Sequence, residues 1–144
     1  MELYTIGFTK KTAKEFFEIL KRNDVKQIAD IRLNNTSQLA GFTKKDDLKY
    51  FLKELCDIDY YHFDFLAPSK EIRDEYNEGK NWDGYTERYI DLLDKREVLK
   101  KLDRKFFEKR TCFLCSESSP EYCHRRLLVE YLKGHWEDVE IIHL

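Results

Sequence analysis

Short apolar runs alternate along the chain with segments whose apolar residues recur at helical spacing. A short apolar run between polar residues predicts a buried strand, and a period near 3.6 residues predicts an amphipathic helix. The runs that predict strands lie at 3–7, 25–31, 58–63, 111–115 and 138–144. The segments that predict helices lie at 12–23, 43–55, 70–77, 85–93, 98–106 and 120–134. Strand and helix therefore alternate through the whole chain.

This alternation predicts the fold class. Strands separated by helices of this length favour right-handed crossovers and a mainly parallel sheet that is covered on both faces. We therefore predict an α/β fold, a Rossmann-like three-layer sandwich with a mainly parallel sheet of about five strands. The 144 residues, 42% of them hydrophobic, fit a single domain over 1–144. The segment 68–110 is predicted to form a helical insertion or lid between the third and fourth strands.

The richest chemistry follows the fourth predicted strand. Ser119 is a good N-cap and Pro120 suits the first helical position, so a helix is predicted to begin at Pro120. Cys115 and Glu117 then precede this helix, and the basic residues 124–126 occupy its opening turns. Cations at a helix start oppose the helix dipole by roughly 0.3–1 kcal/mol each, and a bound anion would relieve that cost. The segment therefore predicts an anion site that also holds a thiol and a carboxylate.

The same segment contains a motif that resembles the hallmark of a known family. It reads Cys115-x-Glu117-x-x-Pro120-x-x-Cys123-His124-Arg125 and is similar to that of the DUF488 family of small uncharacterised proteins. Two further family segments have counterparts at 5–9, Thr-Ile-Gly-Phe-Thr, and at 30–37, Asp-Ile-Arg-Leu-Asn-Asn-Thr-Ser. Phe8 replaces the family's histidine and Asn35 its proline, so no role for a histidine in the first loop is carried over. The resemblance spans almost the whole chain, and it names no activity because the family's function is itself open.

Composition and charge exclude several classes of function. The formal net charge is −2 although 38% of residues are charged, so the chain lacks the overall cationic field of histone-like nucleic-acid binders. A local basic patch is still compatible with this balance. The sequence contains no Gly-x-Gly-x-x-Gly and no Walker loop, so the usual dinucleotide and nucleoside-triphosphate sites lose support. No cofactor is predicted.

The cysteines and the lack of long apolar runs indicate the compartment. No run approaches the roughly 20 apolar residues of a membrane span, and the chain starts on a strand-like segment rather than a signal peptide. We predict a cytoplasmic protein without a membrane partner, whose four cysteines are reduced thiols. Cys112 and Cys115 are spaced as in redox and zinc motifs. Residues three apart on a strand point to opposite faces, however, so these two sulfurs should diverge.

Polar residues collect where the predicted strands end. In open α/β sheets, ligands bind beyond the carboxyl ends of the strands. The residues expected at or near those ends are Gly7, Thr9, Asp30, Arg32, Asn34, the loop with Lys70, Cys115, Glu117 and His143. His124 is a further candidate for ligand binding, and its plainer interpretation is a solvated residue beside two arginines. Arg32 and Arg125, if they meet there, form a double guanidinium site suited to phosphate or carboxylate. Asp30 and Arg32 also lie on the same side of their strand and can simply pair with each other.

Cys115 and Glu117 are the candidate catalytic residues. A thiol beside a helix start and a guanidinium has a stabilised thiolate, which is the condition for a nucleophile. The plainer interpretation of Cys115 is a small apolar residue at a buried strand end. Glu117 fits a general acid or base, and equally an ion-pair partner of Arg125 or a helix cap. A zinc site from Cys115, Cys123 and His124 has poor spacing for structural zinc, so no metal is predicted.

Two functional hypotheses remain at this point. The first is an enzyme that acts on a phosphate-bearing or nucleotide-like ligand, with Arg32 and Arg125 as anion clamps and Cys115 and Glu117 in the chemistry. The second is a non-catalytic module whose basic helix start docks a nucleic-acid phosphate or an acidic partner. The reactivity of Cys115 separates the two, and the sequence leaves the oligomeric state open.

Overall fold

The computed structural model describes residues 1–36 and 41–144, so Ser37, the last residue of the second family segment, lies outside the described residues. The strands are β1 (Glu2–Gly7), β2 (Gln27–Asp30), β3 (Asp59–His62), β4 (Thr111–Cys115) and β5 (Glu140–His143). Within the described residues they form one five-stranded sheet in the order β3-β2-β4-β1-β5. Every neighbouring pair is parallel, and the register aligns Gly7 of β1 with Cys115 of β4.

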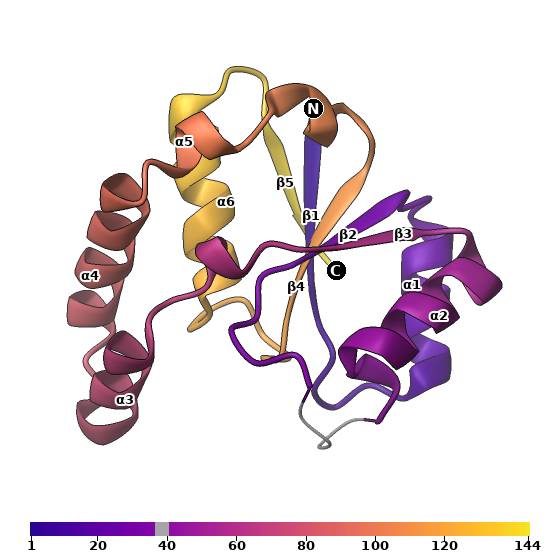
Figure 1. Cartoon of the computed structure of the whole chain (residues 1–144), viewed down its shortest axis with the longest axis horizontal. Helices are drawn as coiled ribbons and strands as arrows, with labels where there is room; N and C mark the ends of the chain where they lie inside the picture. The colour runs from indigo at the N-terminus through magenta and orange to yellow at the C-terminus, as the bar shows by residue number, and fades with distance from the viewer. Residues whose placement is uncertain (37–40) are drawn as a thin grey trace.

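The helices fill the segments between the strands (Figure 1). They are α1 (Ala13–Arg22), α2 (Lys45–Cys56), α3 (Lys70–Gly79), α4 (Trp82–Lys95), α5 (Val98–Lys101) and α6 (His124–His135), with short 3-10 turns η1 (Gly41–Thr43), η2 (Asp64–Leu66) and η3 (Arg104–Glu108). The start of α1 follows directly from sequence, because Thr12 and Glu15 form a reciprocal capping box with N···O distances of 3.1 and 3.2 Å. None of the described helices combines the length and apolar composition needed to span a membrane.

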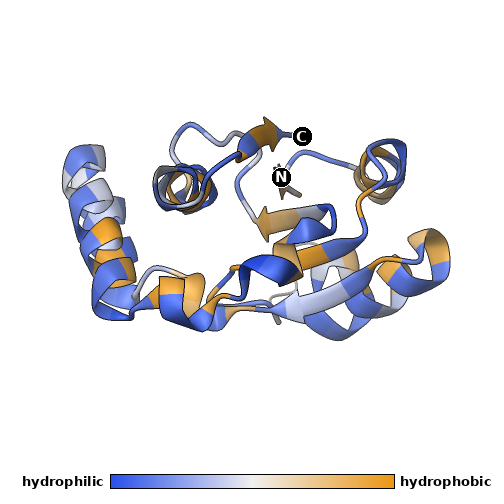
Figure 2. Cartoon of the chain, turned by 90° about the horizontal axis from the view of Figure 1, so that it is seen from above, coloured by the Kyte–Doolittle hydropathy of each residue, from blue (hydrophilic) through white to orange (hydrophobic). Residues whose placement is uncertain are grey.

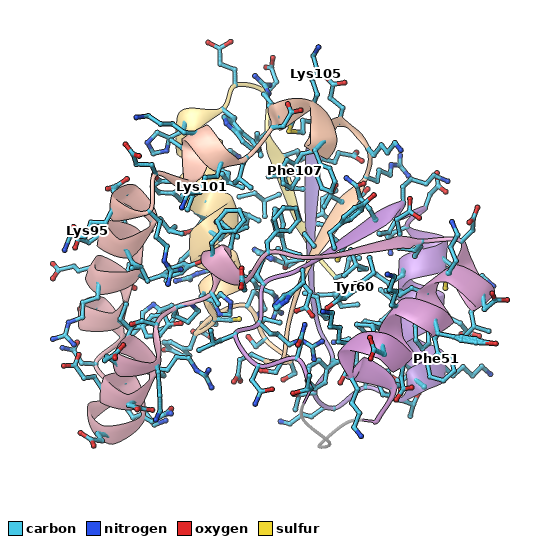
Figure 3. The ribbon with its side chains drawn as sticks, in the orientation of Figure 1. Phe51, Tyr60, Lys95, Lys101, Lys105 and Phe107 are labelled. Atoms are coloured by element: carbon cyan, nitrogen blue, oxygen red, sulfur yellow. The ribbon has the colours of Figure 1, made fainter. Side chains whose placement is uncertain are left out.

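Alternating side chains of the strands build two separate cores. On one face, Cys112 and Leu114 of β4 pack with the apolar residues of α1 and α2. On the other, Phe113 and Cys115 pack with those of α4 and α6. Phe107 stacks on Phe113 with ring centroids 5.7 Å apart, and Figure 3 shows it among the side chains beside the upper part of β1. The predicted α/β fold with three layers is confirmed.

The helices between β3 and β4 extend beyond the layer that covers the sheet. Figures 1 and 2 show α3 and α4 side by side at the edge of the molecule farthest from α1 and α2, and this pair is largely hydrophilic. Hydrogen bonds hold α4 against η2: the Tyr89 hydroxyl donates to the carbonyl of Leu66 at 2.6 Å. Arg96 likewise donates to the carbonyls of Phe65 and Ala67, at 2.7 and 2.6 Å.

The predicted start of the last long helix is wrong by four residues. α6 begins at His124, and its N-cap is Cys123, whose backbone is extended at φ −134° and ψ 140°. Ser119 instead accepts a hydrogen bond from the backbone N–H of Glu121 at 3.2 Å, which stabilises a turn before the helix. This turn leaves the segment 116–123 irregular, so that Cys123 lies at the helix start and not inside the helix. At the other end α6 extends to His135, one residue beyond the predicted range.

Candidate functional site

The strand order creates a crevice at the carboxyl end of β4. The chain leaves β1 and β2 toward the face covered by α1 and α2, and it leaves β4 toward the face covered by α6. Loops that diverge to opposite faces leave an opening between them, which is where open α/β sheets bind ligands. Cys115 is the last residue of β4 and therefore lies at the base of this opening.

A pocket of about 520 Å³ occupies this crevice, a size typical of small-molecule sites. Five parts of the chain supply most of its lining: the ends of β1, β2 and β4, the start of α6, and α3. The lining residues used below are Phe8, Arg32, Asn34, Arg73, Tyr76, Lys80, Tyr85, Cys115, Glu117, Cys123 and His124. The site residues that we predicted at Arg32, Asn34, Cys115, Glu117 and His124 thus share one pocket.

Cys115 is almost fully buried at the floor of this pocket, with 1% of its surface exposed. Burial by itself would raise the pKa of its thiol. Three favourable contacts with the sulfur outweigh that effect and lower the pKa: a hydrogen bond from the thiol of Cys123, the charge and hydrogen bond of Arg125, and the backbone N–H of Glu117. The Arg125 Nη1 atom lies 3.2 Å from the sulfur. The site therefore favours a Cys115 thiolate although it is closed to bulk water.

The other buried cysteines behave in the opposite way. Burial raises the pKa of Cys123 well above its ordinary value, and the neighbouring Cys115 raises it further. Burial also raises the pKa of Cys112, which lies on the opposite face of the sheet from Cys115, as the strand spacing predicted. The three thiols are thus chemically distinct, and Cys115 is the one whose anion is stabilised.

Arg125 holds the thiolate from beneath the pocket. Its side chain is fully buried and does not line the cavity, which differs from our expectation that it contacts a ligand. Besides Cys115, the guanidinium donates to the carbonyls of Glu117 and Ser118 and to the hydroxyl oxygen of Thr5, the last at 3.2 Å. The physical reason is the late start of α6, which places Arg125 in its first turn, beneath residues 117–118.

Thr5 connects Arg125 to the last strand. Because its hydroxyl oxygen accepts from Arg125, its proton is available to the Nδ1 atom of His143, 2.6 Å away. Burial and the charges of Arg125 and Arg126 lower the pKa of His143, which keeps Nδ1 able to accept. Arg125 is therefore fixed by groups from β1, β4 and β5.

Asp30 and Arg32 form a buried ion pair on one wall of the site. The Nε and Nη2 atoms of Arg32 donate to the two carboxylate oxygens of Asp30, each at 2.9 Å, and Nη2 also donates to the carbonyl of Thr43 at 2.7 Å. Asp30 is fully buried and does not line the pocket, and its carboxylate holds the Arg32 guanidinium that does. The Nη1 atom of Arg32 has no hydrogen bond to a described residue, and the Phe8 ring lies 5.4 Å from the guanidinium carbon.

Gly7 and Thr9 shape the site without lining it. A Cβ atom on Gly7 would lie 1.5 Å from the carbonyl oxygen of Glu117, so only glycine lets the end of β1 pass the loop that follows β4. The backbone N–H of Thr9 donates to the carbonyl of Ser116 at 3.0 Å. Both residues therefore fix the 116–117 backbone, and neither reaches the cavity. Asn34 does line it, while its side-chain oxygen accepts from the N–H of Thr36 at 3.1 Å.

Comparison with known proteins places the chain in a family. Residues 12–132 match the family described as a domain of unknown function, DUF488. The chain belongs to the DUF488 family. No curated protein and no solved structure is similar enough to count as a match. The family description carries no activity, so what this DUF488 protein does has to be argued from its pocket.

Sequence reasoning missed the wall of the DUF488 pocket that α3 supplies. Arg73 and Tyr76 of α3 and Lys80, the residue that follows this helix, recur at helical spacing and line the cavity. The ammonium group of Lys80 lies 5.1 Å from the centre of the Tyr76 ring. The spacing of these residues was visible in the sequence, but no motif or strand end marked the helix as part of a site.

The described part of the chain offers no metal centre. No group of three or more histidine, cysteine, aspartate or glutamate side chains within 1–36 and 41–144 is arranged to hold a metal ion. His124 lines the pocket instead as a hydrogen-bond donor, because its Nε2 atom lies 2.9 Å from the carbonyl oxygen of Ile31. Its ring also packs edge-on against Tyr89, with centroids 5.7 Å apart.

His124 should make the stability of this protein fall in mild acid. Burial lowers the pKa of His124 from 6.5 to about 4, with smaller contributions from the charges of Arg73 and Arg125. A pKa lower in the folded than in the unfolded state gives stability that is complete above about pH 6.5 and is lost as the pH falls toward 4, by about 2–3 kcal/mol. Urea denaturation between pH 7.5 and 4 should show this slope in the wild type and a shallower one in His124→Gln. His135→Gln, on the exposed end of α6, should keep the wild-type slope, and equal slopes in all three proteins would contradict the assignment.

Proposed function

We propose that this DUF488 protein is an enzyme that uses the Cys115 thiolate as a nucleophile on a small phosphate-bearing or nucleotide-like ligand. The observation that carries the proposal is the contact between Arg125 and Cys115 at the floor of a pocket. Thiols buried only for packing have no need of a charged partner, and buried charges are costly unless they are paired. A buried guanidinium that three further acceptors hold against a sulfur therefore supports a role for the thiolate.

The charges around the cavity support an anionic ligand. Its wall carries Arg32, Arg73 and Lys80, whereas Glu117 is its one carboxylate among the described residues. The guanidinium of Arg73 has no hydrogen bond or ion pair with a described residue, and Nη1 of Arg32 is also unused. Guanidinium groups suit phosphate because their planar donors bind two oxygens at once. Arg32 and Arg73 are therefore proposed as the phosphate contacts, with Asn34 beside them.

The remaining walls suit an organic group attached to that phosphate. Phe8, Tyr76 and Tyr85 present aromatic surface to the cavity, which can stack on a planar ring such as a nucleobase. Glu117 lies at the rim next to Cys115 and is proposed as the general acid or base for the group that leaves or attacks. His124 is proposed to orient the ligand through its fixed ring. The insertion at 68–110 would then supply one wall of the binding site.

The decisive measurement is the pH dependence of Cys115 alkylation by iodoacetamide, followed for each cysteine by peptide mass spectrometry. Cys115 should react with an apparent pKa well below the usual 8.5 or so of a free cysteine, while Cys112 and Cys123 react slowly at every pH. Adenosine monophosphate and inorganic phosphate should slow the reaction of Cys115 by occupying the pocket.

Protection by these probes should depend on the α3 wall. Arg73→Ala should weaken protection by about tenfold, the loss expected for one charge-assisted contact to phosphate. Lys70→Ala is the matched control, because Lys70 lies on the same helix but does not line the pocket, and it should leave protection unchanged. If Cys115 does not react although the probes still bind, the alternative holds: the protein is a non-catalytic module that docks phosphate groups of a nucleic acid or partner.

A further inference from the structure

We infer that Cys115 and Cys123 form a redox-active dithiol pair, which a hydroperoxide entering the pocket converts into an intramolecular disulfide. The inference extends the proposed function, since it rests on a reactive Cys115 thiolate. It adds a second reacting residue, Cys123, and a chemical class of substrate.

The position of the two sulfurs is the first support. Cys115 ends β4 and Cys123 is the N-cap residue of α6, and each of the two thiols shifts the pKa of the other, so their side chains are neighbours. Both line the same cavity, and both are nearly closed to bulk solvent, with 1% and 2% of their surfaces exposed. A disulfide needs its sulfurs about 2 Å apart, so the two thiols must approach each other to form one.

The backbone around the pair allows that approach. Cys123 precedes the first residue of α6 and has an extended backbone, so its side chain is not constrained by the helix. The connecting segment 116–122 has no regular secondary structure. The other two cysteines cannot compete, because Cys112 faces the opposite side of the sheet and Cys56 lies in α2.

The reaction balances with the hydroperoxide as the only oxidant. The Cys115 thiolate attacks the outer oxygen of ROOH, the O–O bond breaks, and the alkoxide takes up a proton to leave as ROH. Cys115 is then a sulfenic acid, whose sulfur is attacked by Cys123. The S–O bond breaks, and the hydroxyl leaves with the Cys123 proton as water. Two thiols and one hydroperoxide thus become one disulfide, one alcohol or water, and one further water.

Arg125 makes this disulfide easy to reduce. The guanidinium stabilises the thiolate of the reduced form, and it has no equivalent anionic sulfur to contact once the disulfide forms. Stabilising the reduced form makes a disulfide a stronger oxidant, which is the property of a reversible pair and not of a structural crosslink. External dithiols should therefore restore both thiols readily.

Oxidation of the full-length chain with hydrogen peroxide tests the pair. After one equivalent, non-reducing peptide mapping should find a crosslink between the peptides that contain Cys115 and Cys123, and dithiothreitol should remove it. In Cys123→Ser the crosslink is lost and Cys115 stops at a sulfenic acid that dimedone traps, while alkylation of reduced Cys115 persists. Cys112→Ser, the buried control in the same strand, should form the crosslink as the wild type does.

Protection from over-oxidation gives a second readout. Wild-type Cys115 should reach the sulfinic acid about tenfold more slowly than Cys115 in Cys123→Ser, since the disulfide removes the sulfenic acid before it reacts again. Equal over-oxidation in both proteins, or a crosslink that prefers Cys112, overturns the dithiol pair while leaving the nucleophile in place. A Cys115 that resists both alkylation and peroxide overturns the pair and the proposed enzyme together.

Discussion

Asp30→Asn is expected to lower the free energy of unfolding by about 3–5 kcal/mol, the usual cost of leaving one member of a buried ion pair without its partner. Asp30 is fully buried and accepts two hydrogen bonds from the guanidinium of Arg32, both at 2.9 Å, and one from its backbone N–H at 3.1 Å. The Tyr60 hydroxyl also donates to it, and Figure 3 shows Tyr60 between β3 and α2. Asparagine keeps the shape of the side chain but removes the charge, so Arg32 would remain as an uncompensated cation that is only 8% exposed.

Chemical denaturation at pH 7.5 measures this loss, and Asp64→Asn is its matched control. Asp64 is exposed, and its carboxylate makes no hydrogen bond or ion pair with a described residue, so the control should change stability by less than about 0.5 kcal/mol. We expect Asp30→Asn to lose affinity for phosphate probes as well, because Asp30 fixes the direction of Arg32. A loss below about 1 kcal/mol would show that water reaches the pair and that Arg32 does not depend on Asp30.

Arg125→Met should have the largest effect on the chemistry of the site. Methionine fills much of the same volume but donates nothing, so the thiolate of Cys115 loses its cation and the carbonyl of Glu117 loses its donor. Burial then dominates, and the pKa of Cys115 should rise above its ordinary value. Alkylation of Cys115 at pH 7 should slow by more than about tenfold, since each unit of pKa reduces the thiolate fraction tenfold. The unpaired carbonyls should also reduce stability by about 2–4 kcal/mol.

Arg126→Met, one residue further along α6, provides the comparison. Arg126 lies over the ring of Trp82 at 5.8 Å and has only a long contact, 3.9 Å, with Glu130. Its loss should cost less than about 1 kcal/mol and leave the pKa of Cys115 unchanged. Near-ultraviolet circular dichroism should confirm that both variants remain folded. If Cys115 in Arg125→Met titrates as in the wild type, the guanidinium is a structural residue only.

The two arginines that the sequence singled out therefore have different tasks. Arg32 is held by an acidic partner, lines the cavity, and has one nitrogen without a hydrogen bond to a described residue, so it can bind an anion from outside. Arg125 is enclosed by neutral acceptors and one sulfur, so the only anionic group that it can contact is the thiolate of Cys115. Because Arg125 does not line the pocket, the two guanidinium groups do not share it as the sequence predicted. In the proposed function, Arg32 contacts the ligand and Arg125 the thiolate.

The sequence by itself determined the fold class, the opposite directions of Cys112 and Cys115, and the edge of the sheet where several site residues meet. Apolar runs of strand length, separated by helical periods, were enough to predict the α/β sandwich, because burial of alternate faces leaves few other arrangements for such a pattern. The strand spacing of Cys112 and Cys115 correctly predicted that they face opposite sides, since side chains alternate along a strand. The carboxyl ends of β2 and β4 were also predicted as the place where Arg32, Asn34 and Cys115 meet.

Only the tertiary structure decided which side chains are enclosed and which reach the cavity. The capping preference of Ser119 and Pro120 predicted a helix start at Pro120, whereas a turn stabilised by Ser119 precedes a helix that begins at His124. As a result, Arg125 lies beneath the pocket and Cys123 lines it. The contribution of α3 was equally invisible, because a polar helix has the same sequence pattern whether it faces water or a pocket. Side-chain direction depends on contacts between residues distant in sequence, and these form only when the sheet order brings β1, β4 and α6 together.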